Sequence, residues 1–449
     1  MNGRRFAFVG TGGRALSFIE PLVTTYREHH DLVALCDVSA ARMEYYNRLL
    51  AGDLGYRSVP AYAAADFDEM LRRERPDVVF VTSVDATHAD YIVRSLRAGC
   101  DVITEKPMTI DAAQCRAVLA AASETGRRVR VAFNYRWAPF RTKVRELIAS
   151  GVIGRVRSVN LEYLLDTNHG ADYFRRWHAH AGNSGTLLVH KSTHHFDLVN
   201  WWLNAIPAQV FGYGDLVFYG RKNAEARGDG RLAAYPRYTG HPESRGDPFH
   251  LDLDASESFR GLYRAGEADS GYIRDRNVFR DDITIFDQMS LNVRYRTGEV
   301  LTYSLTCYSP REGMRVSFNG DRGRIEYQEF TGTHMNRATR AKDFTFDSKP
   351  GAEAEGETIR VHPHFQGSHA VPVETHAGAH GGGDELLCRS LFDPAANADA
   401  WGRAAGPEQG AASVLVGVAG VTAIRENRPV NLLDLVPLRP AAARLDELS

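Results

Sequence analysis

The stretch "FAFVGTGGRA", residues 6–15, joins a short apolar run to a glycine-rich turn. Gly10, Gly12 and Ala15 fit the pattern G-x-G-x-x-G/A, whose glycines form a tight turn and let backbone amides approach a pyrophosphate. The following residues are helix-like, and a helix N-terminus adds partial positive charge. The pattern predicts a strand, a turn and a helix that bind a dinucleotide. The residues expected around its phosphates are Gly10, Gly12, Gly13 and Arg14, with a solvated side chain as the alternative for Arg14.

The next apolar stretch, "LVALCD", ends at Asp37. A carboxylate about 20 residues beyond the glycine turn accepts hydrogen bonds from the ribose hydroxyls of the adenosine. The same carboxylate would repel a 2'-phosphate. The sequence therefore favours NAD as the cofactor, with NADP as the less favoured alternative.

The chain then alternates between strand-like and helix-like segments. Residues 76–83 ("PDVVFVTS"), 101–107 ("DVITEKP") and 127–136 ("RRVRVAFNYR") are predicted strands, with helices between them. This alternation predicts a doubly wound parallel sheet, which binds ligands at the carboxyl ends of its strands. The residues expected to contact the cofactor at that edge are Asp85, His88, Glu105, Lys106, Pro107 and Asn134, and Tyr135 and Arg136 are expected to bind substrate.

Length, charge and cysteine content restrict the class of protein. A chain of 449 residues predicts two domains. The formal charge of −2 and the lack of a basic run argue against nucleic acid as a partner. The five cysteines are scattered, which is typical of free thiols in a reducing compartment, so we expect a cytoplasmic protein. No apolar run is long enough to predict a membrane span.

A second polar cluster lies in "VHKSTHHFDLVNWWL", residues 189–203. At helical spacing His190, His194 and Asp197 share one face, and apolar residues lie on another. Acid–base chemistry, a metal site and plain surface polarity each explain such a face. Histidines at i and i+4 with a nearby aspartate suit zinc, but we disfavour a metal because a nicotinamide already supplies the electrophile.

Several of these segments, taken in order, resemble the Gfo/Idh/MocA family of NAD(P)-dependent oxidoreductases that act mostly on sugars and cyclitols. The resemblance rests on "GTGGRA", on "THADYIVRSLRAGCDVITEKP", on "NYRWAPFRTKVRELIASGVIGRV" and on the later histidine-bearing segment. It implies that Lys106 holds and polarises the reacting hydroxyl and that Pro107 lies against the nicotinamide. It also implies that His194 is the catalytic histidine, whereas His190 occupies a position where the family usually has aspartate.

The resemblance also implies an architecture. We expect an α/β protein with an N-terminal Rossmann domain, residues 1–135, and a C-terminal α+β domain, residues 136–449, with a large open, mainly antiparallel sheet. Two stretches of unusual composition, near 220–280 and 331–385, predict insertions in the second domain. The family often associates through its sheet, so we expect a homo-oligomer, a dimer or a tetramer.

The chemistry of these residues suits hydride transfer from an alcohol. Removing a hydroxyl proton needs a base, and a nearby cation stabilises the developing alkoxide. We expect Lys106, His190 and His194 to form the catalytic cluster, and no metal is expected. The predicted substrate-binding residues are Lys106, Tyr135, Arg136, Lys191, His194 and Asp197.

Two functions remain open from the sequence. The first is an NAD-dependent dehydrogenase of a sugar, glycoside or cyclitol. The second is a redox-neutral glycosidase, in which NAD transiently oxidises a ring carbon before elimination of the glycosidic group. His190, the insertions and "HGGGDELL" (residues 380–387), which recurs in family members that act on glycosides, favour the second function. The family's majority chemistry favours the first.

Overall fold

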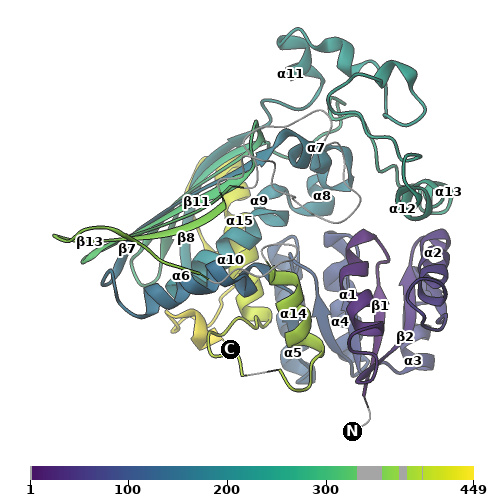
Figure 1. Ribbon diagram of the computed structural model, residues 1–449, viewed down its shortest axis with the longest axis horizontal. Helices are drawn as coiled ribbons and strands as arrows, with labels where there is room; N and C mark the ends of the chain where they lie inside the picture. Colours follow the sequence, from purple (N-terminus) through teal and green to yellow (C-terminus); the bar gives the residue numbers. More distant parts are fainter. Residues whose placement is uncertain (1–2, 331–355, 374–381, 397, 449) are drawn as a thin grey trace.

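The glycine turn begins a six-stranded parallel sheet with helices on both faces (Figure 1). The computed structural model describes residues 3–330, 356–373, 382–396 and 398–448. The sheet order is β3-β2-β1-β4-β5-β6, the doubly wound order that the alternating sequence predicts. Its strands are β1 (Arg4–Val9), β2 (His30–Asp37), β3 (Ala61–Ala63), β4 (Val78–Val81), β5 (Asp101–Thr104) and β6 (Val129–Val131). Its helices are α1 (Gly13–Val23), α2 (Ala40–Ala51), α3 (Phe67–Glu74), α4 (His88–Arg97) and α5 (Ala112–Thr125), with short 3-10 turns η1 (Ala64–Asp66) and η2 (Asp85–Thr87).

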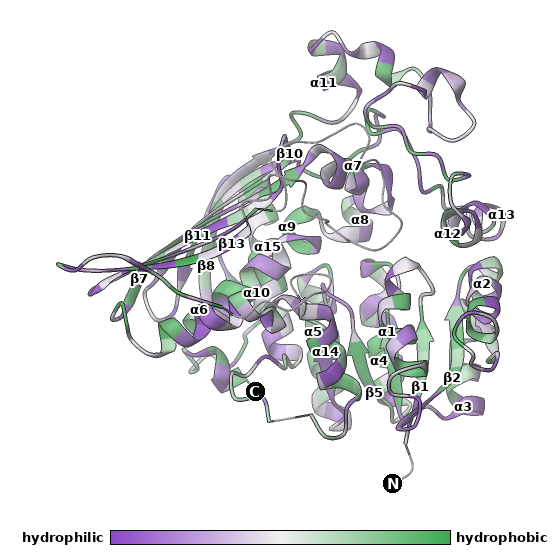
Figure 2. Cartoon of the chain, viewed as in Figure 1, coloured by the Kyte–Doolittle hydropathy of each residue, from purple (hydrophilic) through white to green (hydrophobic). Residues whose placement is uncertain are grey.

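Local sequence signals account for these elements. Every residue of β4 is buried, as a strand covered on both faces requires, and Figure 2 shows the hydrophobic residues concentrated along these central strands. Ser39 and Asp111 cap α2 and α5 by accepting hydrogen bonds from backbone amides of the first turn. Gly126 ends α5 in the left-handed conformation, with φ of 64°.

The second domain is built on a nine-stranded, mainly antiparallel sheet (Figure 1). The strand order is β14-β13-β12-β11-β7-β10-β9-β8-β15, and within it β7 and β10 run parallel. Its strands are β7 (Val156–Asp166), β8 (Pro207–Asp215), β9 (Gln288–Tyr295), β10 (Val300–Ser309), β11 (Gly313–Gly320), β12 (Gly323–Phe330), β13 (Gly356–Pro363), β14 (His369–Ala370) and β15 (Val430–Asn431). The fold class predicted from the sequence is therefore confirmed.

Helices connect the two sheets and cover one face of the larger one. They are η3 (Asn134–Trp137), α6 (Pro139–Ala149), α7 (Thr167–Arg175), η4 (Trp177–Ala179), α8 (Ala181–Ser184), α9 (Leu187–His190), α10 (Ser192–Leu203), α14 (Gly383–Phe392), α15 (Pro407–Glu426), α16 (Leu432–Leu435) and η9 (Leu445–Leu448). Burial along β9 alternates strictly between exposed and buried residues. The other face of the sheet is therefore accessible.

The periodicity of the histidine-bearing segment predicts one helix, but the structure has two. Helix α9 ends at His190, and α10 begins at Ser192. Lys191 between them keeps a right-handed helical conformation, with φ of −91° and ψ of −49°. The break therefore leaves the sequence pattern almost intact.

The first predicted insertion, near 220–280, consists of short helices between β8 and β9. They are α11 (Arg221–Ala226), η5 (Gly230–Ala233), η6 (Pro242–Ser244), α12 (Glu257–Phe259), the π-helical turn η7 (Arg260–Arg264) and α13 (Glu267–Ser270). Figure 1 shows that α12 and α13 lie over α2 of the first domain.

The second predicted insertion, near 331–385, is not a single loop. Residues 331–355 and 374–381 lie outside the described residues. Between them, β13 pairs with β12 along its whole length, so that part belongs to the sheet. The predicted domain boundary near residue 135 stays a prediction. In the described ranges, no helix combines the length and the apolar character needed to cross a membrane.

Candidate active site

The glycine turn has the shape that a dinucleotide pyrophosphate needs. Gly10 has φ of +90°, and a Cβ there would lie 2.4 Å from the backbone nitrogen of Ser83. A Cβ on Gly12 would meet no atom within 4 Å, so the turn opens onto free space. Helix α1 starts at Gly13, and its N-cap residue, Gly12, has no side chain to cap the first turn. Amides at a helix N-terminus suit phosphate oxygens, and the turn therefore fits the cofactor.

Asp37 lies at the end of β2, beside this turn. Its carboxylate accepts hydrogen bonds from the Thr11 amide at 2.5 Å and from the Ser39 amide at 2.9 Å. The guanidinium of Arg42 lies 3.5 Å away. These three contacts hold the carboxylate in place beside the glycine turn. The hydrogen bond from Asp37 to the ribose of the adenosine stays a prediction.

Arg14 is held by two carboxylates. Its Nε donates to Glu105 at 2.7 Å, and its terminal nitrogens donate to Asp384 at 3.0 and 3.2 Å. Asn134 also donates to Asp384, at 2.7 Å. The guanidinium is thus neutralised beside the turn, which weakens the expectation that Arg14 lies over the phosphates. Asp384 belongs to the "GGDELL" motif, whose described part therefore supports the cofactor turn.

Lys106 lies at the carboxyl end of β5, as the sequence predicts. Its Nζ is 3.4 Å from the backbone oxygen of His190. Burial lowers the pKa of its ammonium to about 8, although Glu105 and Asp85 act in the opposite direction. Lys106 can therefore exchange a proton near neutral pH.

His190 reaches across the domain boundary to Asp85, which follows β4. Its Nδ1 lies 2.6 Å from the Asp85 carboxylate. Burial lowers the pKa of His190, and the charge of Lys106 lowers it further. Burial also raises the pKa of Asp85. One proton shared by this pair next to Lys106 is the arrangement of a proton-transfer site.

Lys191, Tyr135 and His194 form the opposite side of the cluster. Lys191 donates to the Tyr135 hydroxyl at 3.2 Å, and the rings of Tyr135 and His194 stack at 4.0 Å with an angle of 10°. Burial alone would lower the pKa of Lys191, but Tyr135, Tyr173 and the Glu312 carboxylate raise it. Lys191 therefore stays a cation while Lys106 exchanges its proton.

Aromatic residues surround His190. The rings of His178, Tyr173 and Trp177 lie 4.2, 5.5 and 5.7 Å from the His190 ring, measured between centroids. Trp177 also stacks on His178 at 3.6 Å. In the sequence, Tyr173 and Trp177 are indicated by their aromatic rings, which could stack on a sugar face, and by their proximity to the histidine segment.

A carboxylate, a histidine and a tyrosine form a hydrogen-bonded chain at the same place. Glu312 lies 2.8 Å from Nδ1 of His169, and Nε2 of that ring lies 3.1 Å from the Tyr173 hydroxyl. A carboxylate at Nδ1 fixes the tautomer of the ring, which leaves Nε2 to accept the phenolic proton. Glu312 lies in the turn between β10 and β11, and no local motif in the sequence points to it.

Two residues that the sequence predicts to bind substrate are buried inside the protein. Arg136 and Asp197 have no exposed side-chain surface and bind each other at 2.6 and 2.8 Å. Ser413 of α15 donates to the same carboxylate at 3.2 Å. The prediction that these two side chains contact substrate is therefore corrected, because both are enclosed by α10, η3 and α15.

Three other residues also have structural partners. Both ring nitrogens of His88 face backbone oxygens, at 2.8 Å from Pro107 and 3.1 Å from Ser83, and the residue is 1% exposed. His88 therefore holds the backbone of Pro107, and its expected contact with the cofactor stays a prediction. Trp201 and Trp202 are buried and pack in the core. Within the described ranges, no three His, Cys, Asp or Glu side chains are grouped to hold a metal ion.

Comparison with known proteins agrees with this geometry. The NAD-binding Rossmann fold of the GFO_IDH_MocA oxidoreductase family matches residues 4–133, and the C-terminal alpha/beta domain of the same family matches residues 145–432. The chain belongs to the Gfo/Idh/MocA oxidoreductase family. It is accordingly an oxidoreductase that acts on CH–OH groups and uses NAD.

Individual Gfo/Idh/MocA relatives extend over different parts of the chain. A Bacillus subtilis protein named "Putative oxidoreductase YteT" is 37% identical over 97% of this chain and 99% of its own length. The inositol 2-dehydrogenase of Rhizobium meliloti is 32% identical over 46% of this chain and 57% of its own length. The solved aldose-aldose oxidoreductase of Caulobacter crescentus has a TM-score of 0.60 and 16% identity, covers 96% of this chain and 100% of its own, and shows the shared fold alone.

Proposed function

We propose that this protein oxidises a secondary hydroxyl of a sugar, glycoside or cyclitol, with Lys106 as the residue that takes the hydroxyl proton. The observation that carries the proposal is the buried ammonium of Lys106, whose pKa is about 8, next to the Asp85–His190 pair. A base with a pKa near the working pH is the most effective one for proton transfer. Bound NAD supplies the acceptor for the hydride of the carbinol carbon.

The residues around Lys106 have other roles in the proposed reaction. Lys191 is a permanent cation on the opposite side of the site and stabilises negative charge on the substrate oxygen. His194, stacked on Tyr135, is positioned by that ring. The Glu312–His169–Tyr173 chain provides a second route for a proton.

The aromatic surroundings support a carbohydrate or cyclitol as the substrate. Tyr173, Trp177 and His178 lie around His190, and Trp177 keeps part of its surface exposed. Aromatic rings bind the apolar faces of sugar rings, and the nearby polar groups bind the hydroxyls. The identity of the R. meliloti relative, an inositol 2-dehydrogenase, points in the same direction.

The glycosidase alternative has no support in the relatives reported above, whose names all describe oxidoreductases. We therefore propose the dehydrogenase alone. Both activities would use the same Lys106 cluster, so the experiment has to separate them by their products.

The test mixes the purified protein and NAD with a panel of free sugars, nitrophenyl glycosides and cyclitols. We expect reduced nicotinamide to form with at least one alcohol, in an amount that equals the oxidised product. The matched control is Lys106→Met, which keeps the length of the side chain but has no titrating group. Nitrophenol release without oxidised product would overturn the proposal in favour of the glycosidase.

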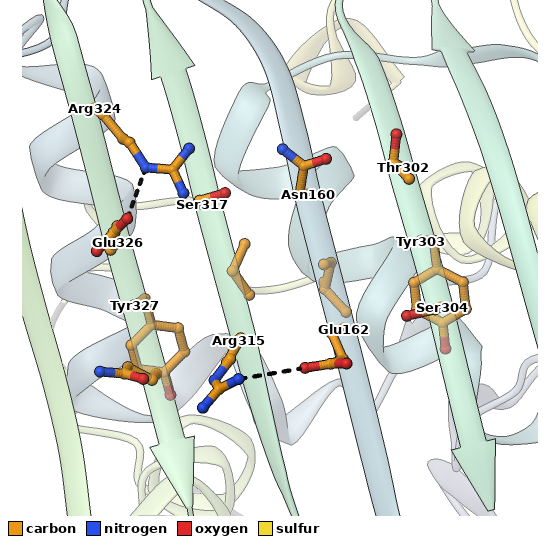
Figure 3. A pocket seen from close by; sticks show the side chains of 13 residues that line it. Asn160, Glu162, Thr302, Tyr303, Ser304, Arg315, Ser317, Arg324, Glu326 and Tyr327 are labelled. Atoms are coloured by element: carbon orange, nitrogen blue, oxygen red, sulfur yellow. Dashed lines mark hydrogen bonds and ion pairs between the residues drawn. The ribbon is translucent and has the colours of Figure 1, made fainter.

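We also propose that the protein is a homo-oligomer that associates through the accessible face of its large sheet. Figure 3 shows a shallow pocket on this face, lined by polar side chains of β7, β10, β11 and β12. Arg324 pairs with Glu326 at 2.8 Å, and Arg315 lies 4.0 Å from Glu162. Ser317 of β11 and Ser304 of β10 are small and lie beside these pairs, so they leave room for a second copy. Finally, the five buried free cysteines support the expected cytoplasmic location.

A further inference from the structure

The insertion between β8 and β9 returns to the first domain and lies on its cofactor turn. We name residues 257–272, which contain α12, η7 and α13, the covering segment. Figure 1 shows α12 and α13 above α2. The segment belongs by sequence to the substrate domain, but it packs against the nucleotide domain.

Polar contacts fasten the covering segment to the start of α2. Asp269 accepts hydrogen bonds from the Ser39 hydroxyl at 2.9 Å and from the Ala41 amide at 3.0 Å. Arg42 donates from Nε to the backbone oxygen of Leu262 at 2.9 Å. These contacts lie next to the end of β2, where the adenosine ribose is expected.

The residues that follow the covering segment are attached to the substrate domain. Arg274 donates to Asp172 of α7 at 2.6 Å, and its side chain is 6% exposed. Arg237, earlier in the same insertion, bridges Glu267 and Asp275 at 2.6 Å each. The covering segment is thus tied to both domains and is held over the turn.

One residue of the segment reaches the phosphate-binding amide itself. The hydroxyl of Tyr263 lies 3.2 Å from the Gly13 amide, the first of α1. In a dinucleotide-binding turn this amide faces the pyrophosphate. A phenol hydroxyl both accepts and donates, so it can bond a phosphate oxygen while staying beside the amide. The residue is 4% exposed, and its ring lies 5.7 Å from the Arg42 guanidinium.

We propose that Tyr263 binds the pyrophosphate of the cofactor and that the covering segment retains the dinucleotide between turnovers. Both roles require only the NAD-binding fold and do not depend on the identity of the substrate. Release of the cofactor would require the segment to leave α2, which breaks the contacts of Asp269 and Arg42 together. The exchange of nucleotide is therefore slow compared with that of an uncovered Rossmann domain.

The experiment measures the release of NADH without any substrate. The full-length protein is loaded with NADH and mixed with a large excess of NAD, and the loss of energy transfer from tryptophan to bound NADH gives the rate. We expect Tyr263→Phe to release NADH about tenfold faster, because a hydrogen bond to a charged group is lost. Asp269→Ala should also release it faster, because the segment loses its attachment to α2.

The matched control is Tyr235→Phe. Tyr235 is a buried tyrosine of the same insertion whose hydroxyl bonds Asp247 instead of the cofactor turn. This variant should release NADH at the rate of the unmodified protein. Equal rates for Tyr263→Phe and the unmodified protein would overturn the phosphate contact, and so would equally fast release from Tyr235→Phe. An unchanged rate in Asp269→Ala would overturn the retaining role. The proposed dehydrogenase activity is not involved in any of these outcomes.

Discussion

At the scale of single residues, Lys106 has the most specific surroundings in the site. We expect Lys106→Met to lower turnover about 100-fold or more, the usual size of an acid–base contribution. NADH binding should stay nearly unchanged, because the side chain lies beyond the glycine turn. The measurement is the turnover number together with the dissociation constant of NADH.

The control for this variant is Lys143→Met. Lys143 lies on α6 and pairs with Glu146, away from the cluster. It should keep full turnover. If Lys106→Met also kept full turnover, another group would have to be the base.

The pH dependence of the reaction gives a second prediction. Since the pKa of Lys106 is about 8, the rate of alcohol oxidation should rise as the pH passes through that value and the base loses its proton. The Asp85 carboxylate favours the protonated form of Lys106. Asp85→Asn should therefore move the rise to lower pH in a profile of turnover against pH. A shift to higher pH would contradict this coupling.

The sequence indicates most of the residues at this site but not their partners. Lys106, His190, Lys191 and His194 come from motifs that can be read locally. The bond between His190 and Asp85 joins residues 105 positions apart, and only the folded chain brings them together. The same reason hides Glu312, which no local pattern connects with His169.

At the scale of elements, the buried pair of Arg136 and Asp197 joins η3 to α10. We expect Asp197→Ala to lower the free energy of unfolding by about 3–5 kcal/mol, because Arg136 is left buried and unpaired. Chemical denaturation measures the change. The surface variant Asp434→Ala should stay within about 0.5 kcal/mol.

A double variant separates the charge from the packing. Arg136→Met with Asp197→Leu removes both charges and keeps much of the volume, so it should be more stable than Asp197→Ala alone. If the double variant were the less stable of the two, the volume and not the unpaired charge would account for the loss.

Helix α15 packs against α9 through glycine. A Cβ on Gly417 would lie 2.3 Å from the backbone oxygen of Leu188, in the helix that carries His190. We expect Gly417→Ala to destabilise the protein by about 1–3 kcal/mol, which outweighs the better helix propensity of alanine. The measurement is the thermal midpoint. Gly367→Ala, which meets no atom within 4 Å, should leave it unchanged.

The sequence predicts elements well where one pattern determines them. The strand, glycine turn and helix of residues 4–23 follow from turn chemistry and burial alone. The break at Lys191 could not be predicted, because this residue keeps helical angles and the spacing of polar residues continues through it. The periodicity that places His190 and Asp197 on one face also fails to show that Asp197 is enclosed by α15.

At the scale of the whole molecule, the sheet face gives a prediction about assembly. An arginine at Ser304, on β10 at one side of the pocket in Figure 3, would place like charges against each other in a symmetric interface. We expect Ser304→Arg to reduce the mass measured by light scattering to that of the monomer. Leu433→Arg, at an exposed position on α16, should keep the mass of the unmodified protein. An unchanged mass in Ser304→Arg would place the interface elsewhere.

The two-domain architecture follows from the sequence, but the path of the insertion does not. Composition alone indicates that residues near 220–280 depart from the rest of the chain. The contact of Tyr263 with Gly13 spans 250 positions, and it depends on how both domains are placed. Composition also gives no sign that β13 continues the sheet, because its neighbours in the sequence lack an alternating pattern.

The proposed retention of the dinucleotide by the covering segment would also affect how long the protein keeps the electrons of its substrate. If the dinucleotide leaves slowly, the two electrons taken from an alcohol stay on the protein for longer than the chemical step takes. The rate of net oxidation would then be limited by the departure of NADH and not by the transfer of the hydride. A burst of bound NADH, equal to the number of active sites, would precede the slower steady formation of free NADH.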